Sequence, residues 1–312
     1  MIEYIYSLIT IALIWTILAQ SYNLSFGLTG LFNLGHIIFY GIGAYSAAIL
    51  NTRYGIGFGP NLLISAAVAG AAASIFGLLT LRLRGHYLAI ATLGAAMIAQ
   101  VVALNWMSLT RGPLGIRGID EPSLFGIPFI GDTLSHVLLY GAIAALLLFL
   151  LWRLFHSPWG RLLRAIRDDE TAAQAVGKNV FAAKLWSLVL SAAFAGVAGA
   201  LYTHYRVFLD PTIFSLQDII LLILIVVVGG RGKFWGVAAG AAFIIVLGEV
   251  PRFLDFPDTM IGAARNLTYA ALLMITMFWR PNGIFSPSKG FKPLVLIDSA
   301  GEHALSVSIT KK

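Results

Sequence analysis

The stretch from Ser157 to Lys184, SPWGRLLRAIRDDETAAQAVGKNVFAAK, is densely charged and lies between strongly apolar segments. The whole chain is 59% hydrophobic and only 11% charged, with a mean hydropathy of +0.86. Soluble domains typically contain about 25% charged residues. We therefore expect a membrane protein that keeps this one charged loop for a soluble partner.

Apolar stretches of the length that crosses the hydrocarbon core as a helix, roughly 20 residues, recur along the 312-residue chain. They predict an all-α fold, a polytopic transmembrane helical bundle of about 8–10 spans that occupies residues 1–285. A polar C-terminal tail, expected to be partly disordered, follows over residues 286–312. The predicted spans are residues 3–20, 33–50, 61–81, 87–106, 134–152, 183–204, 214–230, 234–249 and 263–279.

The distribution of positive charge predicts the orientation of the bundle. Most of the 21 lysines and arginines fall on the same side of the predicted spans as the Ser157 loop. Because cytoplasmic loops carry an excess of Lys and Arg, this loop and the C-terminus are expected in the cytoplasm, with the N-terminus outside. Residues 1–20 lack a basic leader and a small-residue cleavage site, so they predict a retained first helix.

Residues 155–180 are expected to form a helical cytoplasmic loop. Pro158 fits the first turn of a helix and Ser157 can cap it. Arginines then recur every three residues, and small alanines follow an acidic run until Gly177, which predicts the end of the helix. Such a helix can sit in a groove of a partner protein and transmit its motion. The alternative is an ordinary loop whose arginines face lipid head groups.

The segment from Ser21 to Gly43 contains five glycines together with Asn23, Asn33 and His36 at membrane depth. Two interpretations remain open: a broken helix that lines a translocation path, or close helix packing through small residues. His86 and Asn105 are further candidates for polar path-lining groups, and could equally form hydrogen bonds between helices. Small residues four apart, such as Gly196 with Ala200, predict helix packing faces.

Residues 109–131, LTRGPLGIRGIDEPSLFGIPFIG, are rich in Gly and Pro and fall outside the membrane in the predicted topology. A segment of this length exceeds what a simple connection requires. We expect it to form a docking or entrance element on the extracytoplasmic side, in preference to a passive connector.

Motifs for chemistry within the chain are missing. No G-x4-G-K-[ST] sequence occurs, since Gly232-Lys233 is followed by Phe234, and neither H-E-x-x-H nor G-x-S-x-G occurs. The six histidines lack metal-ligand spacing, and the absence of cysteine excludes disulfides and Cys-ligated metals. The predicted spans also lack a central carboxylate of the kind that ion-coupled carriers use. The sequence thus predicts a protein that is not an enzyme, has no catalytic residues or metal site, and receives its energy from outside.

The chain resembles the permease subunits of branched-chain amino acid ABC transporters, LivM type, over about residues 15–285. Thr171-Ala172-Ala173 and Gly177 resemble the EAA-x3-G signature of ABC importer permeases, with Thr in place of Glu. The other matching stretches are Asn23 to Ala48, Arg84 to Gly94, Leu109 to Ile119, Ser157 to Lys184, Ser191 to Tyr202 and Val228 to Gly240. Several matches in the same order carry the resemblance.

The resemblance implies an importer in the bacterial cell (inner) membrane, built from this permease, a homologous second permease, two cytoplasmic ATPases and an extracytoplasmic amino-acid-binding protein. ATP would be used by the partner subunits, with no cofactor bound by this chain. Leucine, isoleucine and valine are the implied substrates. Related permeases carry urea, short amides or other amino acids, and an autonomous channel or facilitator for a small solute is the alternative from another class.

The predicted ATPase-coupling residues all lie in the charged loop: Ser157, Pro158, Trp159, Gly160, Arg161, Arg164, Ala165, Arg167, Asp168, Asp169, Glu170, Ala172, Ala173 and Gly177.

Overall fold

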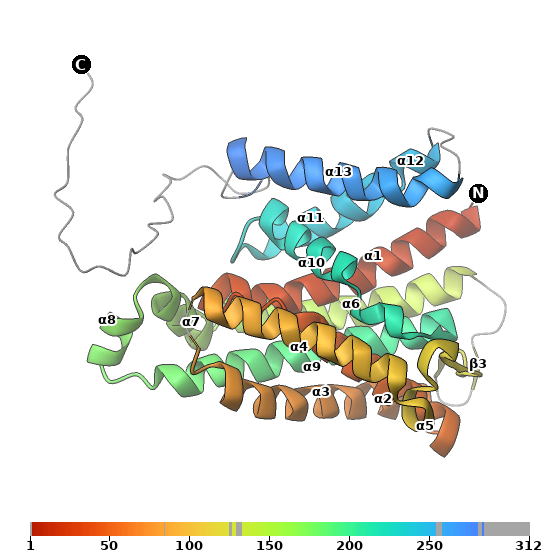
Figure 1. Ribbon diagram of the computed structural model, residues 1–312, viewed down its shortest axis with the longest axis horizontal. Coiled ribbons are helices and arrows are strands. Elements are labelled where there is room, and N and C mark those ends of the chain that lie inside the picture. The colour runs from red at the N-terminus through yellow and green to blue at the C-terminus, as the bar shows by residue number, and fades with distance from the viewer. Residues whose placement is uncertain are drawn as a thin grey trace.

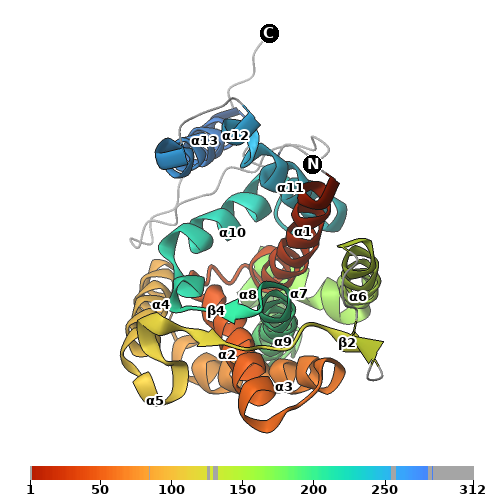
Figure 2. The same cartoon turned by 90° about the vertical axis from the view of Figure 1, so that its right-hand side faces the viewer.

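The computed structural model describes residues 2–83, 85–124, 127–128, 133–253, 258–279 and 283. Long helices run along the main axis of the molecule, and α9 lies among α2, α3 and α7 when viewed along that axis (Figures 1 and 2). The helices are α1 (Ile2–Tyr22), α2 (His36–Tyr54), α3 (Phe58–Thr80), α4 (His86–Asn105), α5 (Met107–Thr110), α6 (Thr133–His156), α7 (Pro158–Asp168), α8 (Glu170–Ala175), α9 (Val180–Arg206), α10 (Leu216–Gly229), α11 (Phe234–Leu247), α12 (Val250–Phe253) and α13 (Asp258–Trp279).

The predicted fold class, a polytopic helical bundle, is confirmed. Within the described residues, six helical segments are long and apolar enough to cross a membrane: Glu3–Leu28, Phe58–Thr80, His86–Asn105, Leu134–His156, Val180–Arg206 and Phe234–Arg252. The apolar helix α10 is shorter, and α2 and α13 occupy the remaining two predicted spans. The first span was predicted to end at residue 20, whereas the helical segment continues to Leu28.

Small residues bring the central helices close together. Gly43 of α2 faces the backbone of Gly196 in α9, and a Cβ placed on Gly196 would lie 2.5 Å from the Cβ of Ala69 in α3. Ala200, one turn further along α9, is fully buried. The predicted packing face of Gly196 with Ala200 is therefore confirmed, and α9 forms the axis against which α2 and α3 pack.

Short strands join two loops at the end of the bundle opposite α7 and α8. Strand β1 (Ile116–Arg117) pairs antiparallel with β4 (Phe208–Leu209), and β2 (Ser123–Leu124) pairs with β3 (Ile127–Pro128). The first ladder ties the segment after α4 to the end of α9. This arrangement places the described part of residues 109–131 against the core, where Asn51 and Asp120 exchange hydrogen bonds. Residues 125–126 and 129–131 of that segment lie outside the described residues, and so does nearly all of the predicted C-terminal tail.

Helices α10 to α13 form a separate layer on one side of the bundle, beside α1 (Figures 1 and 2). The large hydrophobic core joins α1, α2, α3, α9, α10 and α11. A second, smaller core lies at the α7/α8 end. That second core positions the charged loop.

Candidate functional site

Helix α7 begins where the sequence predicts. The Ser157 hydroxyl accepts a hydrogen bond from the backbone N–H of Gly160, at 3.1 Å, and Pro158 occupies the first turn. A side chain at Gly160 would meet the Leu154 carbonyl at 2.5 Å, so the sharp turn from α6 (Thr133–His156) into α7 requires glycine. The cap and the turn together fix the direction in which the charged loop leaves the bundle.

The charged loop contains two helices, which corrects the prediction of a single helix up to Gly177. Asp169 adopts an extended backbone conformation between α7 and α8, and its carboxylate accepts from the N–H of Ala172 at 2.9 Å. Asp169 thus ends one helix and caps the next. The predicted stop is confirmed, because α8 ends at Ala175 and Gly177 has a left-handed φ of 76°.

The three arginines of α7 have different surroundings. Arg161 is exposed, whereas the guanidinium of Arg164 donates to the Phe155 carbonyl at 2.7 Å. Arg167 donates through Nη1 to the Gly27 carbonyl at 2.8 Å and pairs with Asp168 at 3.1 Å. The every-third-residue row is therefore not a uniform solvent-facing surface, because Arg164 and Arg167 turn back onto the protein.

One face of the α7–α8 pair is buried in the second core. Leu163, Ile166 and Ala173 pack there with Leu24 and Leu28, and with Phe155, Val180 and Phe234. Of the predicted coupling residues, the exposed ones are Pro158, Arg161, Ala165, Arg167, Asp168, Asp169, Ala172 and Gly177, the partly exposed ones Ser157, Trp159, Arg164 and Glu170, and the buried ones Gly160 and Ala173. The opposite face of the α7–α8 pair is exposed, and no other part of the described chain covers it.

The first helix changes character where α7 reaches it. After α1, residues Asn23–Leu28 form one stretch of π-helix (η1), and the backbone leaves the helix before α2 begins at His36. Asn23 holds this break to the turn between α10 and α11: its Oδ1 accepts from the Gly232 N–H at 2.8 Å. The helix is interrupted here, and Asn23 and Arg167 bond to backbone groups of the break and of the adjoining turn, which is the kind of compensation that a bilayer requires.

A second arginine packs at this break. Arg231, in the turn between α10 and α11, lies over the Phe26 ring at 5.3 Å from its centre. Partial burial and the positive charge of Arg167 lower the pKa of Arg231. The π-helical segment and the residues that lead from it to α2, hereafter together the hinge (residues 23–35), are thus contacted both by the charged loop and by the α10–α11 turn.

The five predicted path-lining residues fall into two groups. Asn23, Asn33 and His36 are buried at the hinge, where His36 Nε2 lies 3.0 Å from the Ser21 hydroxyl and Asn33 accepts from the Gly35 N–H at 2.8 Å. His86 and Asn105 are exposed at opposite ends of α4, and the Asn105 amide donates to the Val101 carbonyl within its own helix. The structure therefore brings together the first three and separates the last two. Whether any of them lines a path stays a prediction.

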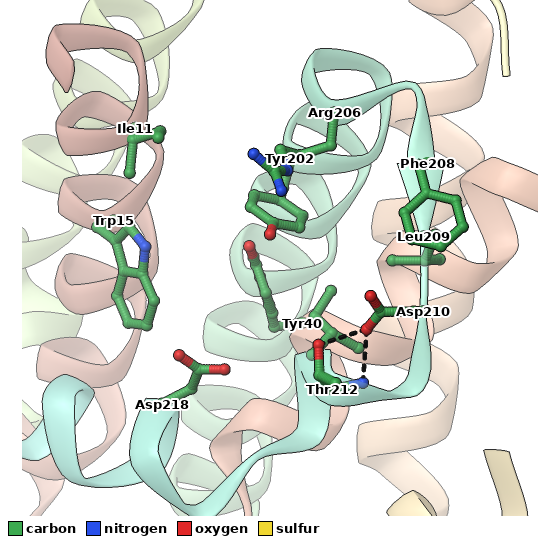
Figure 3. A pocket seen from close by; sticks show the side chains of 11 residues that line it. Ile11, Trp15, Tyr40, Tyr202, Arg206, Phe208, Leu209, Asp210, Thr212 and Asp218 are labelled. Carbon is green, nitrogen blue, oxygen red and sulfur yellow. Dashed lines mark hydrogen bonds between the residues drawn. The ribbon is translucent and has the colours of Figure 1, made fainter. Parts of the chain in front are cut away.

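A partly open cavity of about 250 Å³ lies elsewhere, lined by α1, α2, α9, α10 and the β4–η3 connection (η3, Pro211–Phe214). Its polar lining residues are Tyr40, Tyr202, Arg206, Asp210, Thr212 and Asp218 (Figure 3). Sequence reasoning missed this site because its lining joins three separated parts of the chain: Ile11 and Trp15, Tyr40, and residues 202–218. The one available signal was the charge of Arg206 and Asp218 next to apolar spans. Within the described residues there is no group of three metal-binding side chains.

Comparison with known proteins places nearly the whole chain in one family. Residues 4–278 match the family described as the permease component of the branched-chain amino acid transport system. The chain is 36% and 37% identical to the high-affinity branched-chain amino acid transport system permease proteins LivM of Salmonella typhimurium and Escherichia coli, in each case over 95% of this chain and 73% of the relative. It is 25% identical to LivH of Salmonella typhimurium, over 88% of this chain and 92% of that protein. No solved structure matches.

Proposed function

Because the chain belongs to the permease component family of the branched-chain amino acid transport system, we propose that it is a transmembrane permease subunit of an ABC importer for leucine, isoleucine and valine. The observation that carries this proposal is the similarity to LivM proteins over 95% of the chain. The α7–α8 pair supports it, because a charged surface projecting from an apolar bundle suits a soluble motor subunit.

The proposed assembly contains this subunit, a homologous second permease, two cytoplasmic ATPases and an extracytoplasmic binding protein. Similarity to both LivM and LivH supports a pair of related permeases. In a bacterial inner membrane, the α7/α8 end and the C-terminus would face the cytoplasm, and the β1–β4 end would face outward, where residues 109–131 would meet the binding protein. ATP would be bound and hydrolysed by the ATPases.

The contacts of α7 suggest how motion of an ATPase would reach the membrane. The exposed face of α7 and α8 would rest in a groove of the ATPase, while the buried face is fixed to the second core. Displacement of α7 would act directly on the hinge through the bond from Arg167 to the Gly27 carbonyl. A break in a helix absorbs such a displacement more readily than an intact helix, because its hydrogen bonds are already irregular.

Replacement of Ala172 by tryptophan tests this assignment. Ala172 is exposed on α8, so a bulky side chain there blocks a groove-fitting surface without disturbing the buried face. The change is expected to abolish ATPase association and ATP-driven uptake of radiolabelled leucine in vesicles containing the complete transporter. Thr52→Trp, at an exposed position near the end of α2, is the matched control and should leave ATPase association intact.

The same vesicles distinguish the importer from a facilitator. Uptake that persists without the ATPases and is unaffected by Ala172→Trp would refute coupling through α7–α8 and favour the autonomous facilitator. Competition by isoleucine and valine, but not by urea, is the result expected for the proposed substrates. Competition by urea alone would overturn the substrate assignment while leaving the permease assignment in place.

A further inference from the structure

The cavity between α1 and α9 combines opposite charges with an apolar wall. Arg206 contributes a cation from the end of α9, Asp218 contributes a carboxylate from the first turn of α10, and Ile11 and Trp15 of α1 form the facing side (Figure 3). At roughly 30 Å³ per water in the liquid, its volume of about 250 Å³ equals that of about eight waters. It can therefore hold a small solute of comparable bulk.

The charges that line the cavity are not compensated by one another. Among the residues that the structure describes, neither Arg206 nor Asp218 forms an ion pair within 4.0 Å. The Asp218 Oδ2 atom accepts from the Ser215 hydroxyl at 2.7 Å, while its Oδ1 atom has no hydrogen bond to the described chain. Asp218 is partly buried, and a charge held there costs free energy unless it is paired or solvated. Arg206 is exposed on the cavity lining, where its guanidinium can reach a ligand of opposite charge.

Asp210 has a different role at the same site. Its Oδ1 atom accepts from the Thr212 backbone N–H, at 2.8 Å, and also from the Thr212 hydroxyl. These bonds fix the β4–η3 connection at the mouth of the cavity. Tyr40 and Tyr202 close the inner side, with ring centres 5.9 Å apart. The cavity lining thus holds one cation and two carboxylates. Asp210 is tied to the connection through its Oδ1 atom, so Arg206 and Asp218 are the pair of opposite charges that a zwitterion would match.

We propose that this cavity binds the transported amino acid in transit, with Arg206 contacting its α-carboxylate, Asp218 its α-ammonium group, and Ile11 and Trp15 its aliphatic side chain. The inference rests on the proposed function and adds to it a substrate site within this subunit. The location supports it, since the cavity lies between α1 and the β4–η3 connection, toward the end of the bundle that would face outward, where an imported solute would enter.

The absence of native cysteine makes a direct test available. Thr212→Cys places the chain's one thiol at an exposed position on the cavity lining, and Thr52→Cys places it at an exposed position elsewhere. Leucine is expected to slow modification of the Thr212→Cys thiol by a small thiol reagent in the reconstituted complete transporter. It should leave modification of the Thr52→Cys thiol unchanged.

Two leucine analogues identify which group contacts which end of the ligand. 3-Methylbutylamine lacks the carboxylate and 4-methylpentanoate lacks the amine, so each should protect only at concentrations about ten- to a hundredfold higher than leucine. Asp218→Asn should weaken protection by leucine by a similar factor but leave protection by 4-methylpentanoate unchanged. Arg206→Gln should weaken protection by leucine but not by 3-methylbutylamine. A variant that merely distorts the cavity would weaken all three equally, which would refute the assignment.

ATP-driven leucine uptake by the same transporter separates this proposal from the proposed function. Normal uptake together with no protection by leucine, up to its solubility limit, would refute the cavity site alone. Protection with the expected analogue pattern but without ATP-driven uptake would support the site and refute the importer. Glu3→Gln, which neutralises an exposed carboxylate of α1 away from the cavity, should change neither measurement.

Discussion

The closest approach between α9 and α3 allows a quantitative test of the packing. A methyl group added by Gly196→Ala would lie 2.5 Å from the Cβ of Ala69 and 2.8 Å from the Ser65 carbonyl oxygen. Ordinary contacts begin at 3.4 Å, so the two helices would have to separate by the difference from 2.5 Å, about 0.9 Å. Ala69 and Ser65 are fully buried, and neither has a flexible side chain that could move aside.

Gly94→Ala supplies the matched control, because a Cβ at this position of α4 meets nothing within 4 Å. Alanine is favoured over glycine within a helix by roughly 0.5–1 kcal/mol, and this gain applies to both variants. The comparison therefore isolates the cost of the clash. Overpacking of this kind costs about 1–3 kcal/mol.

Thermal unfolding of the purified protein in lipid nanodiscs measures the difference. At about 2–4 °C per kcal/mol for a chain of this order of size, Gly196→Ala should melt roughly 2–12 °C below Gly94→Ala. Gly94→Ala itself should melt at or slightly above the parent. Equal melting temperatures for the two variants would show that α3 and α9 do not pack through Gly196, and would refute the central arrangement described above.

Two further predictions concern the charged loop. Arg167→Met removes the charge-assisted bond to the Gly27 carbonyl, and bonds of this kind are worth about 1.5–3 kcal/mol. It should lower the amount of leucine transported per ATP hydrolysed about tenfold. Arg153→Met, at an exposed arginine of α6 outside the predicted coupling residues, should preserve that ratio, and equal ratios for the two variants would contradict the mechanical link. Ser157→Ala removes the N-terminal cap of α7 and about 1 kcal/mol of local stability, so limited proteolysis within residues 158–177 should become faster. Ser74→Ala is the control, because the Ser74 hydroxyl donates to the Gly70 carbonyl within α3. Cleavage of both variants at the same rate would show that the cap does not hold α7.

Local sequence features were sufficient for the spans and for the start and stop of the charged loop. Hydrophobic length identifies a membrane helix without knowledge of its neighbours, because the bilayer is the same solvent for each span. Ser157, Pro158 and Gly177 act on the backbone within a few residues, so their effect can be derived from their order alone. The break between α7 and α8 also has a local cause, the cap at Asp169. It was not predicted, because the sequence does not say which residue of the acidic run Asp168-Asp169-Glu170 leaves the helix.

Neither the destination of Arg167 nor the cavity could be derived in this way. The three arginines of α7 are equivalent in spacing, and only the packing of α7 against the hinge brings one of them to the Gly27 carbonyl, 140 residues away. Likewise, Trp15 meets Arg206 and Asp218 because α1 packs against both α9 and α10. The sequence by itself determined that the chain is a bundle of apolar helices and where the charged loop starts and stops, since these depend on local hydrogen bonding and on hydrophobic length. Only the tertiary structure decided which side chains meet, because contacts between distant segments depend on how all the helices fill the interior together.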